Sequence, residues 1–186
     1  MALNVVSEAR RCLNCKKPMC MEGCPISTEI PKMIQMFLNG EMEEAGEMLF
    51  DNNPLSVVCS LVCSHEKQCQ GHCVLGRKGN PVHISSIENY ISTTYLDRLK
   101  FEKPESNGKM VGIVGSGPAG ITIAIELARR GYDVTIFESK DKIGGVLRYG
   151  IPEFRLPKDI VQKEISNLKE MGVDIETNVV IGKTLT

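Results

Sequence analysis

Eight cysteines lie in two groups in the first half of the chain, and thiolates in such numbers are soft ligands for iron or zinc. The first group has the spacing C-x2-C-x4-C-x3-C-P, and the second has gaps of three, five and three residues. The groups are Cys12, Cys15, Cys20 and Cys24, followed by Pro25, and Cys59, Cys63, Cys69 and Cys73. An iron-sulfur cluster needs about four thiolates from several directions, so eight cysteines predict two 4Fe-4S clusters. In two-cluster ferredoxins the fourth cysteine of a comparable run binds the other cluster, and we expect the same of Cys24.

The residues alone leave other uses of these cysteines open. Zinc sites usually use paired C-x2-C knuckles, and here only Cys12 and Cys15 form such a pair. Disulfides suit an oxidising compartment, whereas the first residues carry no signal-peptide pattern. His65 and His72 stand close enough to be considered as ligands, but a solvent-facing or loop-bonded histidine is the simpler interpretation.

A glycine-rich turn in the second half predicts a dinucleotide site. Gly115, Gly117 and Gly120 stand in G-x-G-x-x-G register between a predicted strand and a predicted helix. In such loops the first glycine permits a tight turn, the second lets the backbone approach a pyrophosphate, and the third lets helix and strand pack closely. Glu138, at the end of the next predicted strand, is placed to accept hydrogen bonds from a ribose. Its charge disfavours a 2'-phosphate.

The elements that must position these groups follow from periodicity. Apolar residues at helical spacing predict helices from Glu29 to Leu38, from Glu41 to Phe50 with an end at Asn53-Pro54, and along the face of Ile84, Ile87, Ile91, Tyr95 and Leu99. The second half predicts strands Met110–Val114, Val134–Phe137 and Val173–Glu176, a helix from the glycine turn through Arg130, and another helix from Lys158 to Met171. The cysteine-rich stretch from Cys59 to Cys73 shows no readable period.

These elements predict an α+β protein with two domains. Residues 1–103 are expected to form an α-helical domain that holds the clusters. Residues 109–186 are expected to open an α/β Rossmann-like domain, because a βαβ unit is followed by another helix and strand. The polar stretch Glu102–Gly108 marks the boundary.

Composition excludes several classes of partner. The formal net charge of −1 is spread evenly along the chain, so no basic stripe predicts nucleic-acid binding. No apolar run approaches the roughly 18 residues of a membrane span. We therefore expect a cytoplasmic protein that binds neither nucleic acid nor membrane.

Three runs carry a family resemblance: CLNCKKPMCMEGCP, NNPLSVVCSLVCSHEKQCQGHC and NPVHISSIENY. Together they resemble the N-terminal cluster domain shared by three oxidoreductases. These are the small subunit of bacterial glutamate synthase, dihydropyrimidine dehydrogenase, and the flavoprotein subunit of electron-bifurcating ferredoxin:NADP oxidoreductases. The resemblance covers nearly the whole chain.

This resemblance implies a ligand scheme. One cluster would be held by Cys12, Cys15, Cys20 and Cys73. The other would be held by Cys24, Cys63, Cys69 and Glu88, because a carboxylate or amide in the family often follows a stretch like that from Pro81 to Ile87. Cys59 would then lie close by without binding iron. The choice between Cys59 and Glu88 stays open, since a solvated glutamate in the first turn of a helix is the simpler interpretation of Glu88.

The run KDKIGGVLRYGIPEFRLPKD, after Glu138, resembles the same family, in which it lies along FAD. The resemblance therefore implies that the first dinucleotide site binds FAD, with Arg155 as a polar contact and Gly144 to Val146 lining the cofactor. The residues alone would describe Gly144-Gly145 as a turn and Arg155 as a surface charge. The implied cofactor-binding residues are Gly115, Gly117, Pro118, Ala119, Gly120, Glu138, Gly144, Gly145, Val146 and Arg155.

The family also implies a function. Complete members continue with an NAD(P)H-binding domain and a segment that closes the flavin site. Neither follows within this chain, so we expect its FAD site to be incomplete and FAD to bind weakly. The implied role is electron transfer between NAD(P)H-reduced FAD and 4Fe-4S clusters, with no residue predicted to be catalytic.

The expected partner is a redox subunit, such as the glutamate synthase large subunit or a similar electron acceptor, and a homo-oligomer is an alternative. A second interpretation is a non-enzymatic electron-transfer or assembly module without flavin turnover. A third, the dihydropyrimidine dehydrogenase context, would require pyrimidine-site domains outside this chain.

Overall fold

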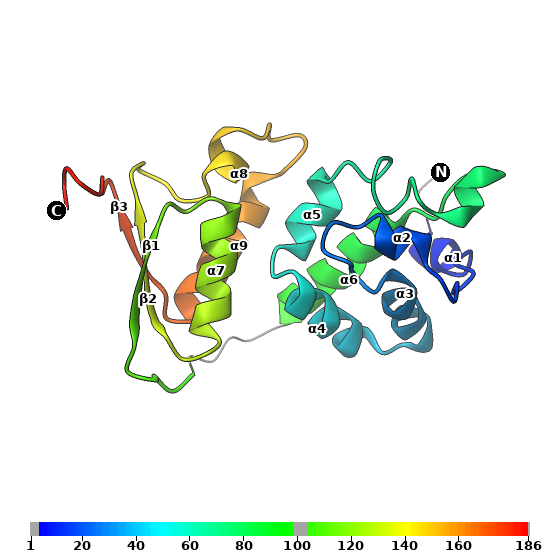
Figure 1. Ribbon diagram of the computed structural model, residues 1–186, viewed down its shortest axis with the longest axis horizontal. Coiled ribbons are helices and arrows are strands. Elements are labelled where there is room, and N and C mark those ends of the chain that lie inside the picture. The colour runs from blue at the N-terminus through cyan, green and yellow to red at the C-terminus, as the bar shows by residue number, and fades with distance from the viewer. Residues whose placement is uncertain (1–3, 99–103, 186) are drawn as a thin grey trace. The chain divides into compact units, whose positions relative to one another are not determined.

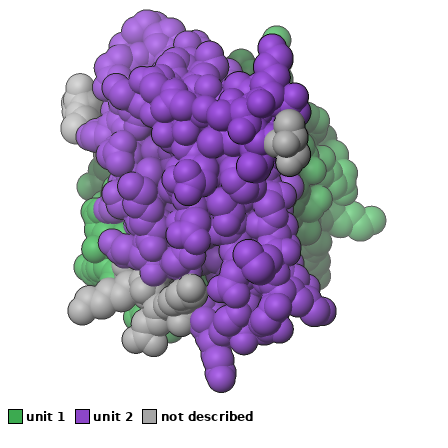
Figure 2. Space-filling view, turned by 90° about the vertical axis from the view of Figure 1, so that its left-hand side faces the viewer, with its two compact units in different colours: residues 1–99 green, residues 100–186 purple. Residues whose placement is uncertain are grey.

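The protein is described here by a computed structural model that covers residues 4–98 and 104–185. The chain divides into two compact units, residues 1–99 and 100–186 (Figures 1 and 2). Unit 1 is helical, and unit 2 contains a parallel sheet with helices. Within the described residues, none of the helices is both long and apolar enough to cross a membrane.

Unit 1 is built from short helices around one longer helix. Its elements are α1 (Val5–Ala9), α2 (Met19–Glu22), α3 (Ile30–Asn39), α4 (Met42–Asn52), α5 (Ser56–Val62), the 3-10 helix η1 (Val74–Arg77) and α6 (Ile84–Arg98). Helix α6 contacts α1, α3, α4 and α5. The core that α6 shares with α3 and α4 includes Met33, Ile34, Leu49, Ile87 and Ile91, all of which are almost fully buried.

The predicted helices of unit 1 are confirmed as α3, α4 and α6, with ends shifted by one or two residues. Gly40 ends α3 in the left-handed region at φ 85°, which a glycine adopts without strain. On α6 the apolar face runs from Ile84 through Ile91 and continues at buried Leu96, whereas Leu99 lies outside the described residues. Helices α1, α2 and α5 carry no clear period in the sequence, because they are at most seven residues long.

Unit 2 is a three-stranded parallel sheet in the order β1-β2-β3. The strands are β1 (Met110–Val114), β2 (Asp133–Glu138) and β3 (Asp174–Thr177), and the helices are α7 (Pro118–Ala128), α8 (Val146–Tyr149) and α9 (Lys158–Glu170). The prediction for β1 is confirmed, that for β2 is one residue short at each end, and that for β3 is displaced by one residue.

The sheet of unit 2 has α7 and α9 on one side (Figure 1). On that side the β-strands pack Ile113, Val134 and Ile136 into a core with the helices. Met110 and Val114 are 84% and 71% exposed, so β1 turns part of its apolar surface away from that core. The arrangement agrees with the α+β class expected from the sequence, a helical part followed by a parallel α/β part.

We predict that Gly46→Ala destabilises unit 1. A Cβ at Gly46 of α4 would lie 2.4 Å from Cβ and from Cγ of Tyr95 on α6, and a Tyr Cβ cannot rotate away. The helices must move apart, which costs about 1–3 kcal/mol and outweighs the roughly 1 kcal/mol gained from helix propensity. The melting temperature measures the effect. Gly79→Ala is the control, because a Cβ there meets nothing within 4 Å. Equal melting temperatures for the two variants would contradict the prediction.

Candidate metal centres and dinucleotide site

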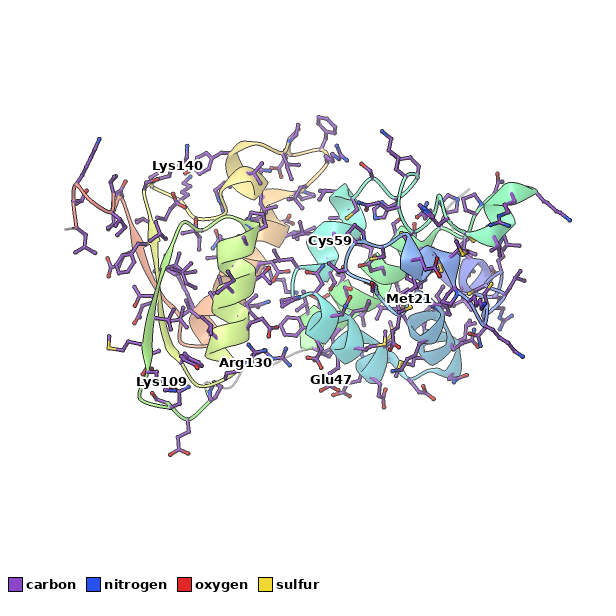
Figure 3. All side chains as sticks on the ribbon, in the orientation of Figure 1. Met21, Glu47, Cys59, Lys109, Arg130 and Lys140 are labelled. Atoms are coloured by element: carbon purple, nitrogen blue, oxygen red, sulfur yellow. The ribbon has the colours of Figure 1, made fainter. Side chains whose placement is uncertain are left out.

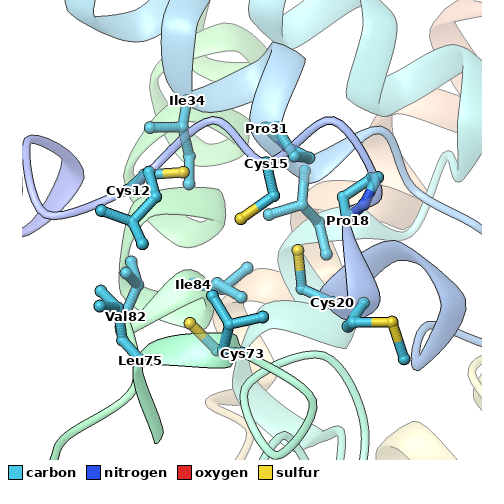
Figure 4. A pocket seen from close by; sticks show the side chains of 14 residues that line it. Cys12, Cys15, Pro18, Cys20, Pro31, Ile34, Cys73, Leu75, Val82 and Ile84 are labelled. Atoms are coloured by element: carbon cyan, nitrogen blue, oxygen red, sulfur yellow. The ribbon is translucent and has the colours of Figure 1, made fainter.

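Four cysteines of unit 1 surround a pocket that we name the first sulfur pocket. Cys12 and Cys15 lie in the loop after α1, Cys20 lies on α2, and Cys73 immediately precedes η1. Their sulfur atoms point toward a common space (Figure 4). Asn14, between the first two cysteines, has a φ of 46°, a left-handed turn that lets Cys12 and Cys15 face the same pocket. The structure thus brings together two cysteines that are 61 residues apart in sequence, Cys12 and Cys73.

The remaining wall of the first sulfur pocket is apolar. Its lining includes Pro18, Pro31 and Ile34 on one side and Leu75, Val82 and Ile84 on another. Burial in these surroundings raises the pKa of Cys12 and raises that of Cys20 to about 11, because a thiolate loses its hydration there. Thiolates that bind a soft metal must therefore gain their stabilisation from the metal charge.

A second sulfur pocket collects the other predicted ligands. It is lined by Cys24, Cys63, Cys69 and Glu88, and Cys59 lines the same pocket. Cys24 follows α2, Cys59 lies on α5 (Figure 3), and Glu88 comes from the second turn of α6. Glu88 lines this pocket and its side chain is partly buried, so it is not a freely solvated surface glutamate.

The two pockets share segments because the cysteine-bearing stretches cross. A Cβ at Gly23, next to Cys24, would lie 2.4 Å from Nδ1 of His72, next to Cys73. The chain therefore passes between the pockets at Gly23 and again at His72. Buried Ile30, at the start of α3, lines both pockets. This crossing carries Cys24 away from Cys12 to Cys20 and brings Cys73 to them.

The thiols and the carboxyl group of the second pocket influence one another. A hydrogen bond from Cys63 lowers the pKa of Cys59 to about 6, helped by Asn53 and opposed by burial. The same hydrogen bond, with burial, raises the pKa of Cys63 far above its usual range. Burial chiefly raises the pKa of Cys69 to about 12, and burial with the nearby Cys59 charge raises that of Glu88 to about 8. Negative charges on Cys63, Cys69 and Glu88 are therefore costly here without a metal, whereas the charge on Cys59 is stabilised by its hydrogen bonds.

Polar groups that the sequence did not reveal also reach these sulfurs. The side-chain nitrogen of Asn53 donates to Sγ of Cys59 over 3.1 Å. Buried Thr28 has its Oγ1 3.4 Å from Sγ of Cys24 and donates to Oδ1 of Asn52 over 2.8 Å. In the sequence Asn53 indicated only a helix end, and no motif singled out Thr28.

The two histidines differ in position. His65 lines the second sulfur pocket. His72 is exposed, and its Nδ1 lies 2.7 Å from the backbone oxygen of Gln68, which makes it a loop-bonded histidine. Neither contributes to the first sulfur pocket.

The glycine-rich loop of unit 2 has the geometry that its motif predicts. Gly115 turns the chain at φ 94°, which favours glycine. A Cβ at Gly120 would lie 2.1 Å from the backbone oxygen of Gly115, so helix and loop can approach only without a side chain. Pro118 begins α7, with Ala119 next, and no side chain caps this helix end. Amides of the first turn are thus available to an anion.

Glu138 ends β2 beside this loop and is 5% exposed. Its Oε2 accepts from the backbone nitrogen of Ser116 over 3.0 Å and from the Ser116 hydroxyl. Its Oε1 accepts from the backbone nitrogen of Lys140 over 2.9 Å and from Ser139 Oγ over 3.2 Å. Burial opposes ionisation, but these hydrogen bonds outweigh it and lower the pKa of Glu138.

Ser116 is a residue that the motif did not single out, because its position in G-x-G-x-x-G accepts any residue. It is fully buried and ties three segments together. Besides its bonds to Glu138, it accepts from Gly144, whose backbone nitrogen lies 3.1 Å from both the backbone oxygen and the Oγ of Ser116. The signal that the sequence offered for this residue was a serine inside a glycine-rich loop.

The Gly144-Gly145 pair lies against the glycine-rich loop. Both residues have positive φ, 122° and 50°, and a Cβ at Gly145 would come within 2.7 Å of the Gly117 Cα. The pair is therefore more than a turn, since side chains there would push the two loops apart. Val146 begins α8 with an exposed side chain, and exposed Arg155 lies in the segment between α8 and α9.

Unit 1 has the features of an iron-sulfur protein, and unit 2 has the fold of a nucleotide-binding Rossmann-like domain. The family described as dihydropyrimidine dehydrogenase domain II, 4Fe-4S cluster, matches residues 2–99, and the chain belongs to this family. The family described as NAD(P)-binding Rossmann-like domain matches residues 113–163.

Curated relatives fall in both functional contexts named above. The chain is 38% identical over 187 residues to NAD-dependent dihydropyrimidine dehydrogenase subunit PreT of Escherichia coli O157:H7, covering 99% of the chain and 45% of that relative. It is 36% identical to the glutamate synthase (NADPH) small chain of Azospirillum brasilense, covering 95% of the chain and 37% of that relative. It is 38% identical to glutamate synthase (NADH) of Saccharomyces cerevisiae, covering 96% of the chain and 8% of that relative.

The resemblance expected from the sequence is therefore confirmed. These relatives are named as oxidoreductases, and the chain spans less than half the length of each. Identities of 36% to 38% do not separate the dihydropyrimidine dehydrogenase context from the glutamate synthase context.

We predict that Glu138→Gln weakens unit 2 at neutral pH by about 1–3 kcal/mol, because a neutral amide meets four hydrogen-bond donors. The folded pKa of Glu138 is lowered, so the stabilisation is complete above its unfolded pKa and is lost as pH falls through the folded pKa. The difference between the unmodified protein and the variant should therefore shrink in acid. Hydrogen exchange of the β1 and β2 amides measures it.

The matched control is Glu126→Gln on α7, whose carboxylate pairs with Arg130 at 3.0 Å on the surface. Such pairs contribute at most about 1 kcal/mol. A loss at Glu126 as large as at Glu138, or a Glu138 effect that grows in acid, would refute the prediction.

Proposed function

We propose that this chain carries two 4Fe-4S clusters in unit 1 and binds part of a flavin dinucleotide in unit 2. In this proposal residues 1–103 are the cluster domain and residues 109–186 are part of an FAD-binding domain. The observation that carries it is the separation of the cysteines into two pockets, each with a complete set of four donors.

The kind and number of the donors support clusters over single zinc ions. Zinc sites usually use paired C-x2-C knuckles, and only Cys12 and Cys15 form such a pair. Eight thiols divided between two pockets are soft donors that fit iron and sulfide.

The ligands we propose follow the two pockets. Those of the first sulfur pocket are Cys12, Cys15, Cys20 and Cys73, and those of the second are Cys24, Cys63, Cys69 and Glu88. Glu88 is preferred to Cys59 as the fourth ligand. Helix α6 is held by its buried Ile87 and Ile91, so it presents Glu88 to the pocket from a fixed frame. The Cys59 sulfur is already engaged by Asn53 and Cys63.

In unit 2 the residues fit the adenosine diphosphate end of FAD. The uncapped start of α7 can donate amides to a pyrophosphate, and Glu138 can accept from a ribose. The carboxylate already has four donors, which fills its lone-pair sites. A ribose hydroxyl would therefore replace Ser139, the donor from an exposed side chain, and leave the buried Ser116 bonds intact. Gly144, Gly145, Val146 and Arg155 are proposed to line the cofactor.

The function we propose is electron transfer between FAD reduced by NAD(P)H and the clusters, in a cytoplasmic oxidoreductase. Bound flavin supplies the change from two-electron to one-electron chemistry, and this chain's residues hold the cofactors in place. Relatives named as a subunit and a small chain support a redox partner subunit, such as a glutamate synthase large subunit or a dihydropyrimidine dehydrogenase subunit.

We predict that anaerobically reconstituted protein contains about eight irons and about eight acid-labile sulfides per chain, because each of two donor sets binds one cluster. Elemental analysis and sulfide assay measure this. Zinc without sulfide would contradict the proposal.

We also predict that Glu88→Ala loses one cluster and keeps the other, so that iron falls from about eight to about four per chain. The Cys12 to Cys73 set does not include Glu88, and its EPR signal should remain. The matched control is Glu43→Ala, an exposed glutamate on α4, which should keep all iron. Full iron content in the Glu88→Ala variant would remove Glu88 from the ligand set.

A further inference from the structure

The two sulfur pockets differ in the polar groups that surround their sulfurs. Apart from the cysteines, the first sulfur pocket is lined by apolar residues such as Pro18, Ile34 and Val82. The second has Thr28 and Asn53 in its lining, and both lie within hydrogen-bond distance of a sulfur. This difference has a consequence for any cluster that the second pocket holds.

Cys59 is the first of the groups that reach a ligand sulfur. Cys59 lies one helical turn before Cys63, whose backbone nitrogen donates to the Cys59 backbone oxygen over 3.1 Å, and both residues line the second sulfur pocket. In the metal-free protein a hydrogen bond from Cys63 to the Cys59 side chain lowers the pKa of Cys59. When the Cys63 sulfur binds iron it gives up its proton. The hydrogen bond can then persist only with the Cys59 thiol as donor and the Cys63 sulfur as acceptor. Asn53, whose side-chain nitrogen is 3.1 Å from Sγ of Cys59, donates to the same sulfur and helps to hold it in place.

Thr28 stands in the same relation to Cys24. Its hydroxyl oxygen lies 3.4 Å from the Cys24 sulfur, and in the metal-free protein the thiol donates to it. A Cys24 sulfur bound to iron has no proton to donate. It carries negative charge, and a charged acceptor attracts the hydroxyl proton more strongly than the neutral Asn52 amide oxygen. The hydroxyl therefore turns from Asn52 to Cys24.

We infer that Cys59 and Thr28 bind no iron but donate hydrogen bonds to the ligand sulfurs of Cys63 and Cys24, and so raise the reduction potential of the second cluster. The inference rests on the proposed function, since it needs a cluster in that pocket. A reduced cluster carries one more negative charge than an oxidised one, and donors to its sulfurs stabilise that charge. Cys59 and Thr28 are thus positioning residues that tune the cluster through its ligands.

The test is a redox titration followed by EPR on reconstituted full chain, with Cys59→Ala and Thr28→Val as variants. Each variant should keep about eight irons per chain, lower the midpoint potential of one cluster and leave the other unchanged. We expect the ratio of reduced to oxidised cluster at a fixed potential to fall about tenfold, which is about 59 mV for one electron.

Conservative variants separate a hydrogen bond from a change in packing. Cys59→Ser and Thr28→Ser keep a hydroxyl donor, so each should return the potential most of the way to that of the unmodified protein. Thr94→Val makes the same chemical change on α6 at a threonine that lines neither pocket, and both potentials should stay unchanged. The serine variants also cover the case in which Cys59→Ala or Thr28→Val fails to fold.

Each adverse outcome has a distinct meaning. Eight irons with unchanged potentials in Cys59→Ala and Thr28→Val would overturn this inference and leave the proposed function standing. Loss of about four irons in Cys59→Ala, with Glu88→Ala intact, would make Cys59 the ligand and overturn the inference as well. Absence of iron and sulfide from the unmodified reconstituted chain would remove the proposed function itself.

Discussion

Four thiolates cannot share an apolar pocket unless positive charge lies among them. Burial raises the pKa of Cys12, Cys20 and Cys69, so without metal these side chains favour the neutral thiol. Metal charge reverses that preference, and binding therefore couples to the folding of every segment that supplies a sulfur. The segments concerned, residues 12–24 and 59–73, have little regular structure of their own. The buried residues of α3 and α6 form the frame on which these segments converge.

The sequence predicts the parts of this arrangement that have a local cause. Cysteine spacing indicates two donor sets, because cysteines that bind one cluster often lie close together in short loops. The G-x-G-x-x-G motif indicates a strand, a turn and a helix, because each glycine is required by the backbone geometry at its position. Amphipathic helices such as α3 and α6 are also predictable, and most of their ends are predicted to within one or two residues. The ligand scheme, in contrast, came from family resemblance, since the crossing at Gly23 and His72 depends on tertiary packing.

What could not be predicted depends on contacts between distant residues. Asn53 and Cys59 are six positions apart, and their hydrogen bond exists because the chain turns at Asn53 into α5. Ser116 and Glu138 are 22 positions apart and meet because β1 and β2 are neighbours in the sheet. Gly144 follows β2 and Ser116 follows β1, so the same pairing of strands places Gly144 next to Ser116. No local pattern encodes such meetings, although each involves a buried polar residue that has to find a partner.

The second sulfur pocket combines two features that would act on a bound cluster. In the proposed ligand scheme, Glu88 places a hard oxygen ligand where the first pocket has a fourth thiolate. The hydrogen bonds that we infer from Cys59 and Thr28 to ligand sulfurs would favour the reduced cluster. The first pocket has neither feature, because its lining is thiol and apolar. Clusters in the two proposed donor sets would therefore differ in reduction potential, although most of the ligands in both sets are cysteines. Such a difference would give electron transfer between them a preferred direction, because the electron is more stable at the cluster of higher potential.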